Sequence, residues 1–224
     1  MAPSSTLKIS PSLASVPMAH LAEVVADLER AGVDMIHFDL EDGHFVPAVM
    51  TLGTRLIGEL RPLTHLPFDV HLMVSDPEQM IPVVAELGGD TIAAHYEACL
   101  YPRRTLRQIK ELGKGAGMAF NPKTPLPDLE YLLPHLDYVV ILTTEPELPD
   151  CPFIPQALDN VRAAAAFARE HYPTLGIVAD GGIDASNVAQ AIEAGANVVV
   201  AGRGVFGGGR IVENVRRMRD AAAT

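Results

Sequence analysis

Short apolar runs alternate with helical patterns along the chain, and this alternation constrains the fold more than any other feature. Eight runs have the length and apolar character of strands in a parallel sheet: Leu7–Ser12, Met35–Leu40, Phe68–Met73, Thr91–Tyr96, Gly115–Asn121, Tyr138–Thr143, Gly176–Asp180 and Asn197–Gly202. A helical pattern follows each run: Ala19–Ala31, Thr51–Leu60, Pro77–Leu87, Tyr101–Leu112, Asp128–Leu136, Ala157–Glu170, Ala185–Ala194 and Ile211–Ala222. Eight strand-helix units in 224 residues predict an α/β fold, a (β/α)8 TIM barrel that forms a single domain over residues 1–224. A doubly wound open sheet is the alternative.

Charge and composition narrow the class of partner. The formal net charge is −11 at pH 7, whereas a nucleic acid or an acidic membrane surface requires a basic footprint. No apolar run reaches the roughly 18 residues of a membrane-spanning helix, and the first residues lack the pattern of a signal peptide. Cys99 and Cys151 have no metal-ligand spacing, which suits a reducing compartment. We therefore expect a cytoplasmic protein that binds a small molecule.

One predicted strand carries three groups that can bind a metal or transfer a proton. Side chains of a strand alternate between two faces, so His37, Asp39 and Glu41 share one face of the strand that begins at Met35. Charged groups buried without partners cost several kcal/mol, so such a face is expected to find a metal or a counter-charge. The alternative is a surface strand with a hydrated face, and partners elsewhere in the chain decide between the two.

Polar side chains also gather at the other predicted strand ends, where a barrel of this kind carries its active residues. They are Ser10 and Ser12, His71 and Met73, His95 and Glu97, Asn121, Thr143, Asp180, and Gly202 and Arg203. Together with His37 and Asp39, His71 and Asp180 make a set of two histidines and two carboxylates. This set suits one divalent ion such as Zn²⁺, Mn²⁺ or Fe²⁺, and the ligand types do not choose among them. Each residue alone could be a satisfied core polar group, but four at equivalent strand ends favour a metal site.

Several motifs combine into a family resemblance. They are Ile9-Ser10-Pro11-Ser12-Leu13, His37-Phe38-Asp39, Asp42-Gly43-His44-Phe45-Val46-Pro47, Asp69-Val70-His71-Leu72-Met73, Asn121-Pro122-Lys123-Thr124-Pro125 and Asp180-Gly181-Gly182. With these motifs the whole chain resembles the ribulose-phosphate 3-epimerase family. The resemblance implies one divalent metal ion held by His37, Asp39, His71 and Asp180. It also implies that Asp39 and Asp180 are the catalytic acid/base pair, that the substrate is a sugar or sugar phosphate, and that the protein is a homo-oligomer.

The chemistry of epimerisation explains why a pair of carboxylates is needed. Inverting the carbon beside a carbonyl removes a proton from one face and returns a proton to the other, so one base could only restore the starting isomer. The enediolate oxygens that develop need positive charge, which a bound metal supplies as a Lewis acid. Ser12 and Asn121 are candidates to hydrogen-bond substrate hydroxyls, although Asn121 could instead begin the turn with Pro122.

The chain departs from the family at the loops expected to hold phosphate. The family's glycine-rich loop after the sixth strand, Asn-Pro-Gly-Phe-Gly-Gly-Gln, is replaced by an acidic, proline-containing segment at residues 145–151. The family's Ala-Gly-Ser after the eighth strand becomes Ala201-Gly202-Arg203, and Glu41 stands where the family has methionine, while Met73 is retained. The substrate-binding set that we predict is Ser12, Glu41, Met73, Asn121, Gly181, Gly182, Gly202 and Arg203. We expect Arg203 to anchor the tail of the substrate, and D-ribulose 5-phosphate to be a poor substrate.

Three classes of function follow from these observations. The first is a metal-dependent epimerase acting beside the carbonyl of a ketose or ketose phosphate. Its alternative is an epimerase or isomerase of the same barrel that acts on a non-phosphorylated or carboxylate-bearing substrate held by Arg203. The second is a lyase or decarboxylase of the related phosphate-binding barrels, which the absence of lysine from the strand ends disfavours. The third is a non-catalytic binding barrel, for which two carboxylates beside a metal would have no purpose.

Overall fold

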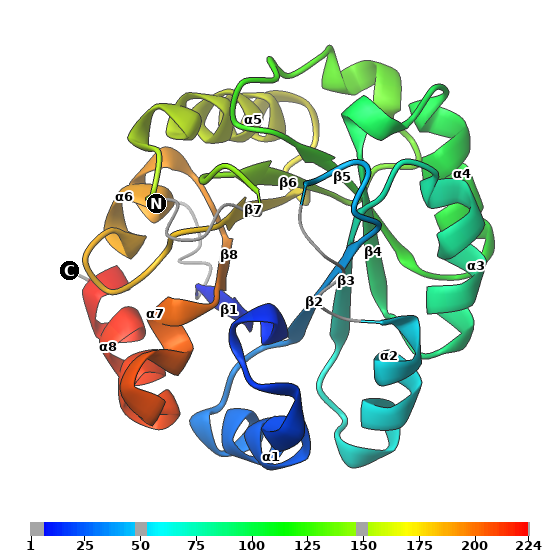
Figure 1. Cartoon of the computed structure of the whole chain (residues 1–224). Helices are drawn as coiled ribbons and strands as arrows, with labels where there is room; N and C mark the ends of the chain where they lie inside the picture. The colour runs from blue at the N-terminus through cyan, green and yellow to red at the C-terminus, as the bar shows by residue number, and fades with distance from the viewer. Residues whose placement is uncertain (1–6, 48–52, 147–151, 224) are drawn as a thin grey trace.

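The strands form the inner wall of a closed barrel. The structure, a computed structural model, describes residues 7–47, 53–146 and 152–223. Its strands are β1 (Lys8–Pro11), β2 (Ile36–Glu41), β3 (Phe68–Met73), β4 (Thr91–His95), β5 (Gly115–Phe120), β6 (Tyr138–Leu142), β7 (Gly176–Asp180) and β8 (Val198–Ala201). Figure 1 shows these strands at the centre with the helices in a ring around them. This architecture confirms the predicted (β/α)8 barrel.

Every strand pair is parallel, and the strand order runs β1-β8-β7-β6-β5-β4-β3-β2. The circle closes through a parallel bridge between Ser12, just after β1, and His37 on β2. An open, doubly wound sheet would leave β1 and β2 at separate edges, so that alternative is wrong.

The helices of the described residues are α1 (Leu21–Ala31), α2 (Thr54–Leu60), α3 (Pro77–Glu86), α4 (Pro102–Glu111), α5 (Leu158–His171), α6 (Val188–Ala194), α7 (Arg203–Phe206) and α8 (Ile211–Ala222). Most agree with the predicted helices to within three residues, and the predicted start of the second helix at Thr51 lies outside the described residues. The short helix α7 was not predicted. No helix within these ranges combines the length and apolar character needed to cross a membrane.

The predicted helix Asp128–Leu136 is wrong. The segment after β5 contains only a 3₁₀ turn over Leu129–Leu132, so this βα unit lacks an α-helix. Pro134 is the physical reason, because its ring disfavours the helical conformation of the preceding residue, and Leu133 is extended with ψ 150°. The apolar spacing that suggested a helix instead buries Leu129 and Leu132 at 3% and 0% exposure.

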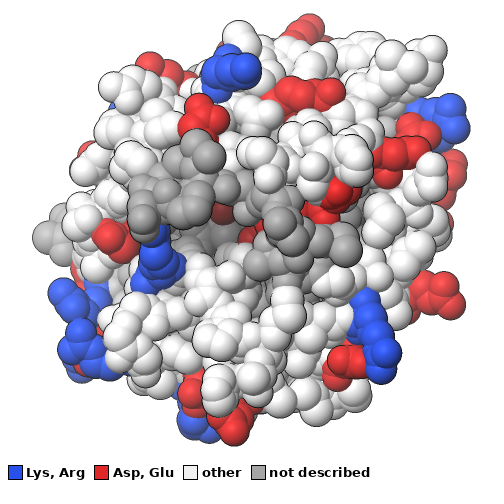
Figure 2. Space-filling model, viewed as in Figure 1, with Lys and Arg blue, Asp and Glu red and all other residues white. Residues whose placement is uncertain are grey.

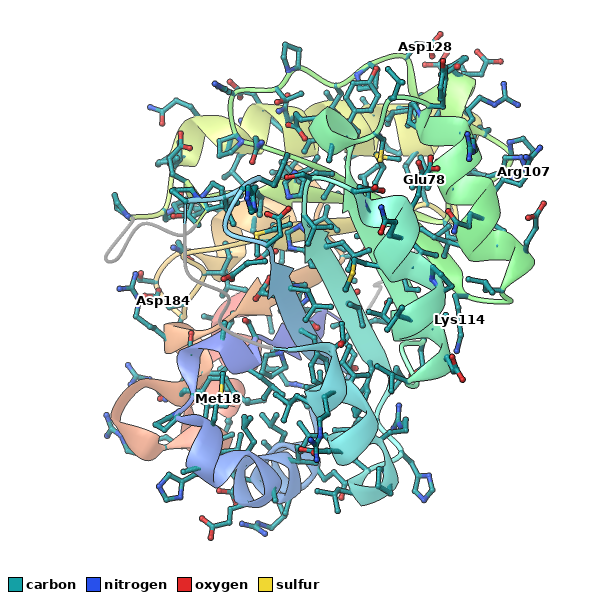
Figure 3. The ribbon with its side chains drawn as sticks, turned by 45° about the vertical axis from the view of Figure 1, so that its right-hand side comes forward. Met18, Glu78, Arg107, Lys114, Asp128 and Asp184 are labelled. Carbon is teal, nitrogen blue, oxygen red and sulfur yellow. The ribbon has the colours of Figure 1, made fainter. Side chains whose placement is uncertain are left out.

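Neighbouring helices are joined by polar side chains as well as by apolar packing. Glu78 on α3, labelled in Figure 3, accepts a hydrogen bond from the Thr105 hydroxyl of α4 at 3.2 Å. The Arg104 guanidinium of α4 lies 3.3 Å from the same carboxylate. These contacts hold α3 against α4 on the outside of the barrel.

The inward faces of β6, β7 and β8 form an apolar layer inside the barrel. Val140, Val178 and Val198 pack together on the inward face with the ring of Tyr138. The ring of Tyr138 fills the space over Gly117, where an added Cβ would lie 2.3 Å from it. Because side chains alternate along a strand, the inward face that carries Val178 near the base carries Asp180 at the carboxyl end of β7. The fold therefore places Asp180 beyond this apolar layer, at the carboxyl end of β7.

Candidate active site

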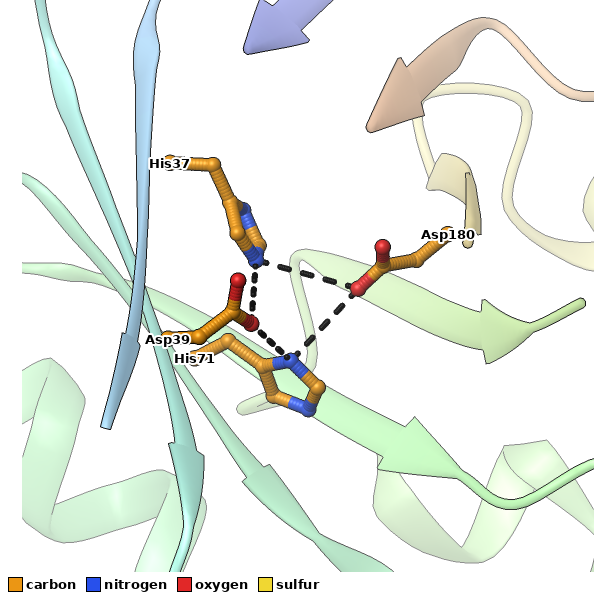
Figure 4. Close-up of side chains that lie close together, drawn as sticks. All are labelled: His37, Asp39, His71 and Asp180. Atoms are coloured by element: carbon orange, nitrogen blue, oxygen red, sulfur yellow. Dashed lines mark hydrogen bonds and ion pairs between the residues drawn. The ribbon is translucent and has the colours of Figure 1, made fainter. Parts of the chain in front are cut away.

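Two histidines and two aspartates from three strands converge inside the barrel. His37 and Asp39 come from β2, His71 from β3 and Asp180 from β7, and one ligand atom of each lies within 4.8 Å of the others. Both histidines are fully buried, and the two aspartates are 8% and 7% exposed. Figure 4 shows the four side chains pointing toward one another. The four residues predicted from the strand ends therefore form one cluster.

Each histidine directs one ring nitrogen at both carboxylates. Nε2 of His37 lies 3.1 Å from Oδ1 of Asp39 and 3.7 Å from Oδ2 of Asp180. Nδ1 of His71 lies 3.2 Å and 3.5 Å from the same two oxygens. Two nitrogens and two oxygens thus face a common centre, which is the donor set of Zn²⁺, Mn²⁺ and Fe²⁺ sites. These residues fit a divalent metal.

The cluster shifts the pKa values of its members in opposite directions. Burial opposes the charged imidazolium, but the carboxylates of Asp180 and Asp39 outweigh it and raise the pKa of His71 to about 9. Burial likewise opposes protonation of His37, yet Asp39 and Asp69 raise its pKa well above the ordinary value. Burial would raise the pKa of Asp39, but His37 and His71 lower it well below its usual range. In the metal-free protein, protons on the histidines therefore balance the carboxylates.

A buried carboxylate lies behind His37. Oδ2 of Asp69 accepts a hydrogen bond from Nδ1 of His37 at 2.8 Å, and the Thr91 hydroxyl donates to Oδ1 at 2.8 Å. Burial would raise the pKa of Asp69, but the nearby His37 lowers it. This contact fixes Nδ1 as the protonated nitrogen and leaves Nε2 toward the cluster. Our sequence analysis missed Asp69 as a site residue, although alternation already placed it on the same face of β3 as His71.

A cavity of about 730 Å³ opens above the cluster. Asp39, His71 and Asp180 line it, while the fully buried His37 lies behind them. Figure 2 views this end of the barrel, where acidic side chains are visible in the central hollow. The cavity also reaches Arg217 of α8, which our sequence analysis did not single out and whose position in the chain gives no signal of it.

The predicted substrate-binding residues fall into two groups. Those that line the cavity are Ser12, Met73, Gly181, Gly182, Gly202 and Arg203. Glu41 is buried at 2% exposure and Asn121 is half-buried, and neither is among the residues that line the cavity. Ser12 also donates a hydrogen bond from its hydroxyl to Oδ2 of Asp39 at 2.5 Å.

The acidic segment predicted to replace the family's glycine-rich loop is described only in part. Glu145 and Pro146 line the cavity, and residues 147–151 lie outside the described residues. At least one carboxylate of this segment therefore faces the same cavity as Arg203.

Comparison with known proteins places the chain in a family. The model of the ribulose-phosphate 3 epimerase family matches residues 8–206. The chain belongs to the ribulose-phosphate 3-epimerase family. A ribulose-phosphate 3-epimerase of Bacillus subtilis (strain 168) is 40% identical over 202 residues, which cover 90% of this chain and 93% of that protein. One from Synechocystis is 39% identical over 220 residues, which cover 97% and 95%. Family membership makes the chain an enzyme of the isomerase class and confirms the resemblance inferred from the motifs.

Two solved structures of similar fold have distant sequences. The crystal structure of 3-keto-L-gulonate-6-phosphate decarboxylase from Vibrio cholerae matches with a TM-score of 0.71 and 13% identity, covering 97% of this chain and 98% of that one. Orotidine 5'-monophosphate decarboxylase from Sulfolobus solfataricus matches with a TM-score of 0.64 and 14% identity, covering 97% and 98%. At such identities the likeness concerns the barrel alone.

Proposed function

We propose that this member of the ribulose-phosphate 3-epimerase family is a metal-dependent epimerase that inverts the carbon beside the carbonyl of a ketose or ketose phosphate. His37, Asp39, His71 and Asp180 would hold one divalent ion. The observation that carries the proposal is that Asp39 and Asp180 reach the floor of one cavity from different strands, β2 and β7. When bound, the ion supplies positive charge that stabilises the enediolate oxygens.

The two aspartates divide the proton transfers. Asp39 begins as the base, because the nearby histidines hold its pKa low and the Ser12 hydroxyl donates to its Oδ2. It removes the proton from the carbon beside the carbonyl on one face of the substrate. Asp180 delivers a proton to the same carbon from the other face, and the two exchange roles in the reverse direction.

Two substitutions test the proposal. Asp180→Asn should abolish epimerisation because an amide cannot carry the proton, while its carbonyl oxygen can still contact a metal. The epimer whose proton faces Asp39 should nevertheless exchange that proton with D₂O, without inversion. His71→Ala should lose the stoichiometric metal measured in purified wild type. Appreciable turnover in Asp180→Asn would remove the two-base mechanism, and unchanged metal content in His71→Ala would remove the metal site.

The tail of the substrate has two candidates. The first is a phosphate, as the names of the relatives suggest, held by Arg203 and by the backbone N–H groups of Gly181, Gly182 and Gly202. The second is a carboxylate-bearing or uncharged tail, favoured by Glu145 in the cavity wall, whose charge would oppose a dianion. The low efficiency that we expect for D-ribulose 5-phosphate stays a prediction.

Kinetics with D-ribulose 5-phosphate separate the two tails. We would compare kcat/KM in wild type, Arg203→Lys and Arg203→Ser. A wild-type value at or above about 10⁵ M⁻¹s⁻¹ would establish the phosphate tail, because ordinary enzymes reach this range on their own substrates. A much lower value, together with a higher one for a non-phosphorylated or carboxylate-bearing ketose, would establish the changed tail. In both cases Arg203→Ser should lower kcat/KM for an anionic substrate more than Arg203→Lys does.

A further inference from the structure

A chain of hydrogen bonds leads from His71 away from the cavity. Nε2 of His71 lies 2.9 Å from Nε2 of His95, at the end of β4, and Nδ1 of His95 lies 3.1 Å from Oε2 of Glu97. His95 is fully buried, and its ring stacks on that of His71 with centroids 4.9 Å apart. Our sequence analysis noted His95 and Glu97 at a strand end, and the proposed reaction gives them no role.

The positions of the protons in these hydrogen bonds follow from the Glu97 carboxylate, where the series ends. The Glu97 carboxylate can only accept, so Nδ1 of His95 carries the proton of that contact. A buried imidazole is stable in its neutral form, which makes Nε2 of His95 an acceptor. Nε2 of His71 must then donate. Its Nδ1 faces Asp39 and Asp180, so the second proton of His71 lies there in the metal-free protein, and its release leaves the lone pair that a metal would take. One arrangement of protons satisfies every contact.

Glu97 is itself held in place from the neighbouring strand. Its other carboxylate oxygen, Oε1, accepts the backbone N–H of Asn121 at 2.8 Å and the hydroxyl of Thr124. Both donors belong to the loop that follows β5, and the carbonyl of Thr124 in turn accepts from Asn160 on α5 at 2.9 Å. Glu97 therefore has a fixed position from which to orient His95.

We propose that His95 and Glu97 are positioning residues that hold His71 in the tautomer offering Nδ1 to the metal. The inference rests on the metal site of the proposed function. The two metal-binding histidines are then supported by different means: His37 donates directly to Asp69, whereas His71 reaches the carboxylate of Glu97 through His95. Such support typically changes metal affinity by about 10–100-fold.

A matched pair of variants at His95 tests the proposal. His95→Gln keeps one acceptor and one donor, whereas His95→Leu has neither at a similar volume. The zinc dissociation constant would be measured by chelator competition, beside ¹⁵N NMR of the His71 ring. We expect Nε2–H in His71 of the zinc-loaded wild type, zinc binding about 10–100-fold weaker in His95→Leu, and recovery toward the wild-type affinity in His95→Gln. Glu97→Gln provides a second route should His95→Leu fail to fold, and should weaken zinc binding by about tenfold.

The outcomes separate this inference from the proposed function. Absence of stoichiometric zinc in wild type, or zinc unchanged in His71→Ala, would defeat the metal site itself. Zinc that is lost in His71→Ala but held with wild-type affinity in both His95→Leu and Glu97→Gln would defeat only the role of His95 and Glu97. A proton on Nδ1 of His71 in the zinc-loaded wild type would likewise defeat the role of His95 and Glu97.

Discussion

Replacing Asp69 by asparagine removes the charge behind His37 and leaves the side-chain shape nearly unchanged. Asp69 is 3% exposed, and its Oδ2 lies 2.8 Å from Nδ1 of His37. The asparagine carbonyl can still accept from His37, and its amide can donate to the Thr91 hydroxyl that now donates to Oδ1. The substitution therefore isolates the charge from the geometry.

The size of the effect follows from that one contact. A hydrogen bond to a charged group contributes about 1.5–3 kcal/mol, against about 0.5–1.5 kcal/mol for a neutral one. The difference of about 1–1.5 kcal/mol corresponds to metal binding about 5–12-fold weaker, because about 1.4 kcal/mol is a factor of ten. A less basic His37 is the cause.

Chelator competition with zinc at one fixed pH measures this change. Asp137→Asn is the matched control, because Asp137 precedes β6 at the opposite end of the barrel and contacts Lys110 and the backbone N–H of Ala116. The control should bind zinc as wild type does. A folded Asp69→Asn protein with an unchanged zinc dissociation constant would refute the reasoning that an outer carboxylate tunes His37.

Three further predictions concern proton release, packing and the loop after β2. The pKa of His71 is raised to about 9, so this residue holds a proton at pH 7.5 that zinc must displace. Zinc binding should therefore release protons, and the apparent zinc affinity should rise with pH up to about 9. Calorimetry in buffers of different ionisation enthalpy measures the proton release, and zero release would contradict the prediction. Gly117→Ala should lower the free energy of unfolding by about 1–3 kcal/mol, because the new Cβ would lie 2.3 Å from the Tyr138 ring. Urea titrations measure this change, and an unchanged free energy of unfolding would show that the ring moves freely. Asp42→Asn should speed amide exchange at Ser75, whose N–H donates to Oδ2 of Asp42 at 2.7 Å; unchanged protection would contradict this.

The strands and most helices could be predicted from the sequence because their periodicity reflects burial. β3 (Phe68–Met73), β7 (Gly176–Asp180) and α8 (Ile211–Ala222) have the predicted bounds, and each begins or ends beside a sharp change in composition. The segment after β5 could not be predicted in this way. There an apolar spacing typical of a helix competes with Pro134, and the proline's backbone restriction prevails.

The cluster of His37, Asp39, His71 and Asp180 could be predicted, whereas the contacts of the side chains behind it could not. Strand ends of a barrel meet at one face, so the residue types at those ends were enough to bring His71 and Asp180 together. The contact between His37 and Asp69 depends on strand register, which pairs these two residues across β2 and β3. The contact between His71 and His95 depends on how the two imidazole rings are oriented. Neither register nor ring orientation is encoded in the alternation of a single strand.

The most direct test of a metal-dependent, two-carboxylate epimerase is deuterium incorporation followed by NMR. Wild-type protein would be incubated in D₂O with D-ribulose 5-phosphate and a panel of other phosphorylated, free and carboxylate-bearing ketoses, before and after removal of metal by a chelator. We predict one deuterium at the carbon beside the carbonyl, formation of the epimer at that carbon, loss of both on metal removal, and recovery when a divalent ion is restored. Absence of exchange with every ketose of the panel, or exchange that is unaffected by metal removal, would contradict the proposed function.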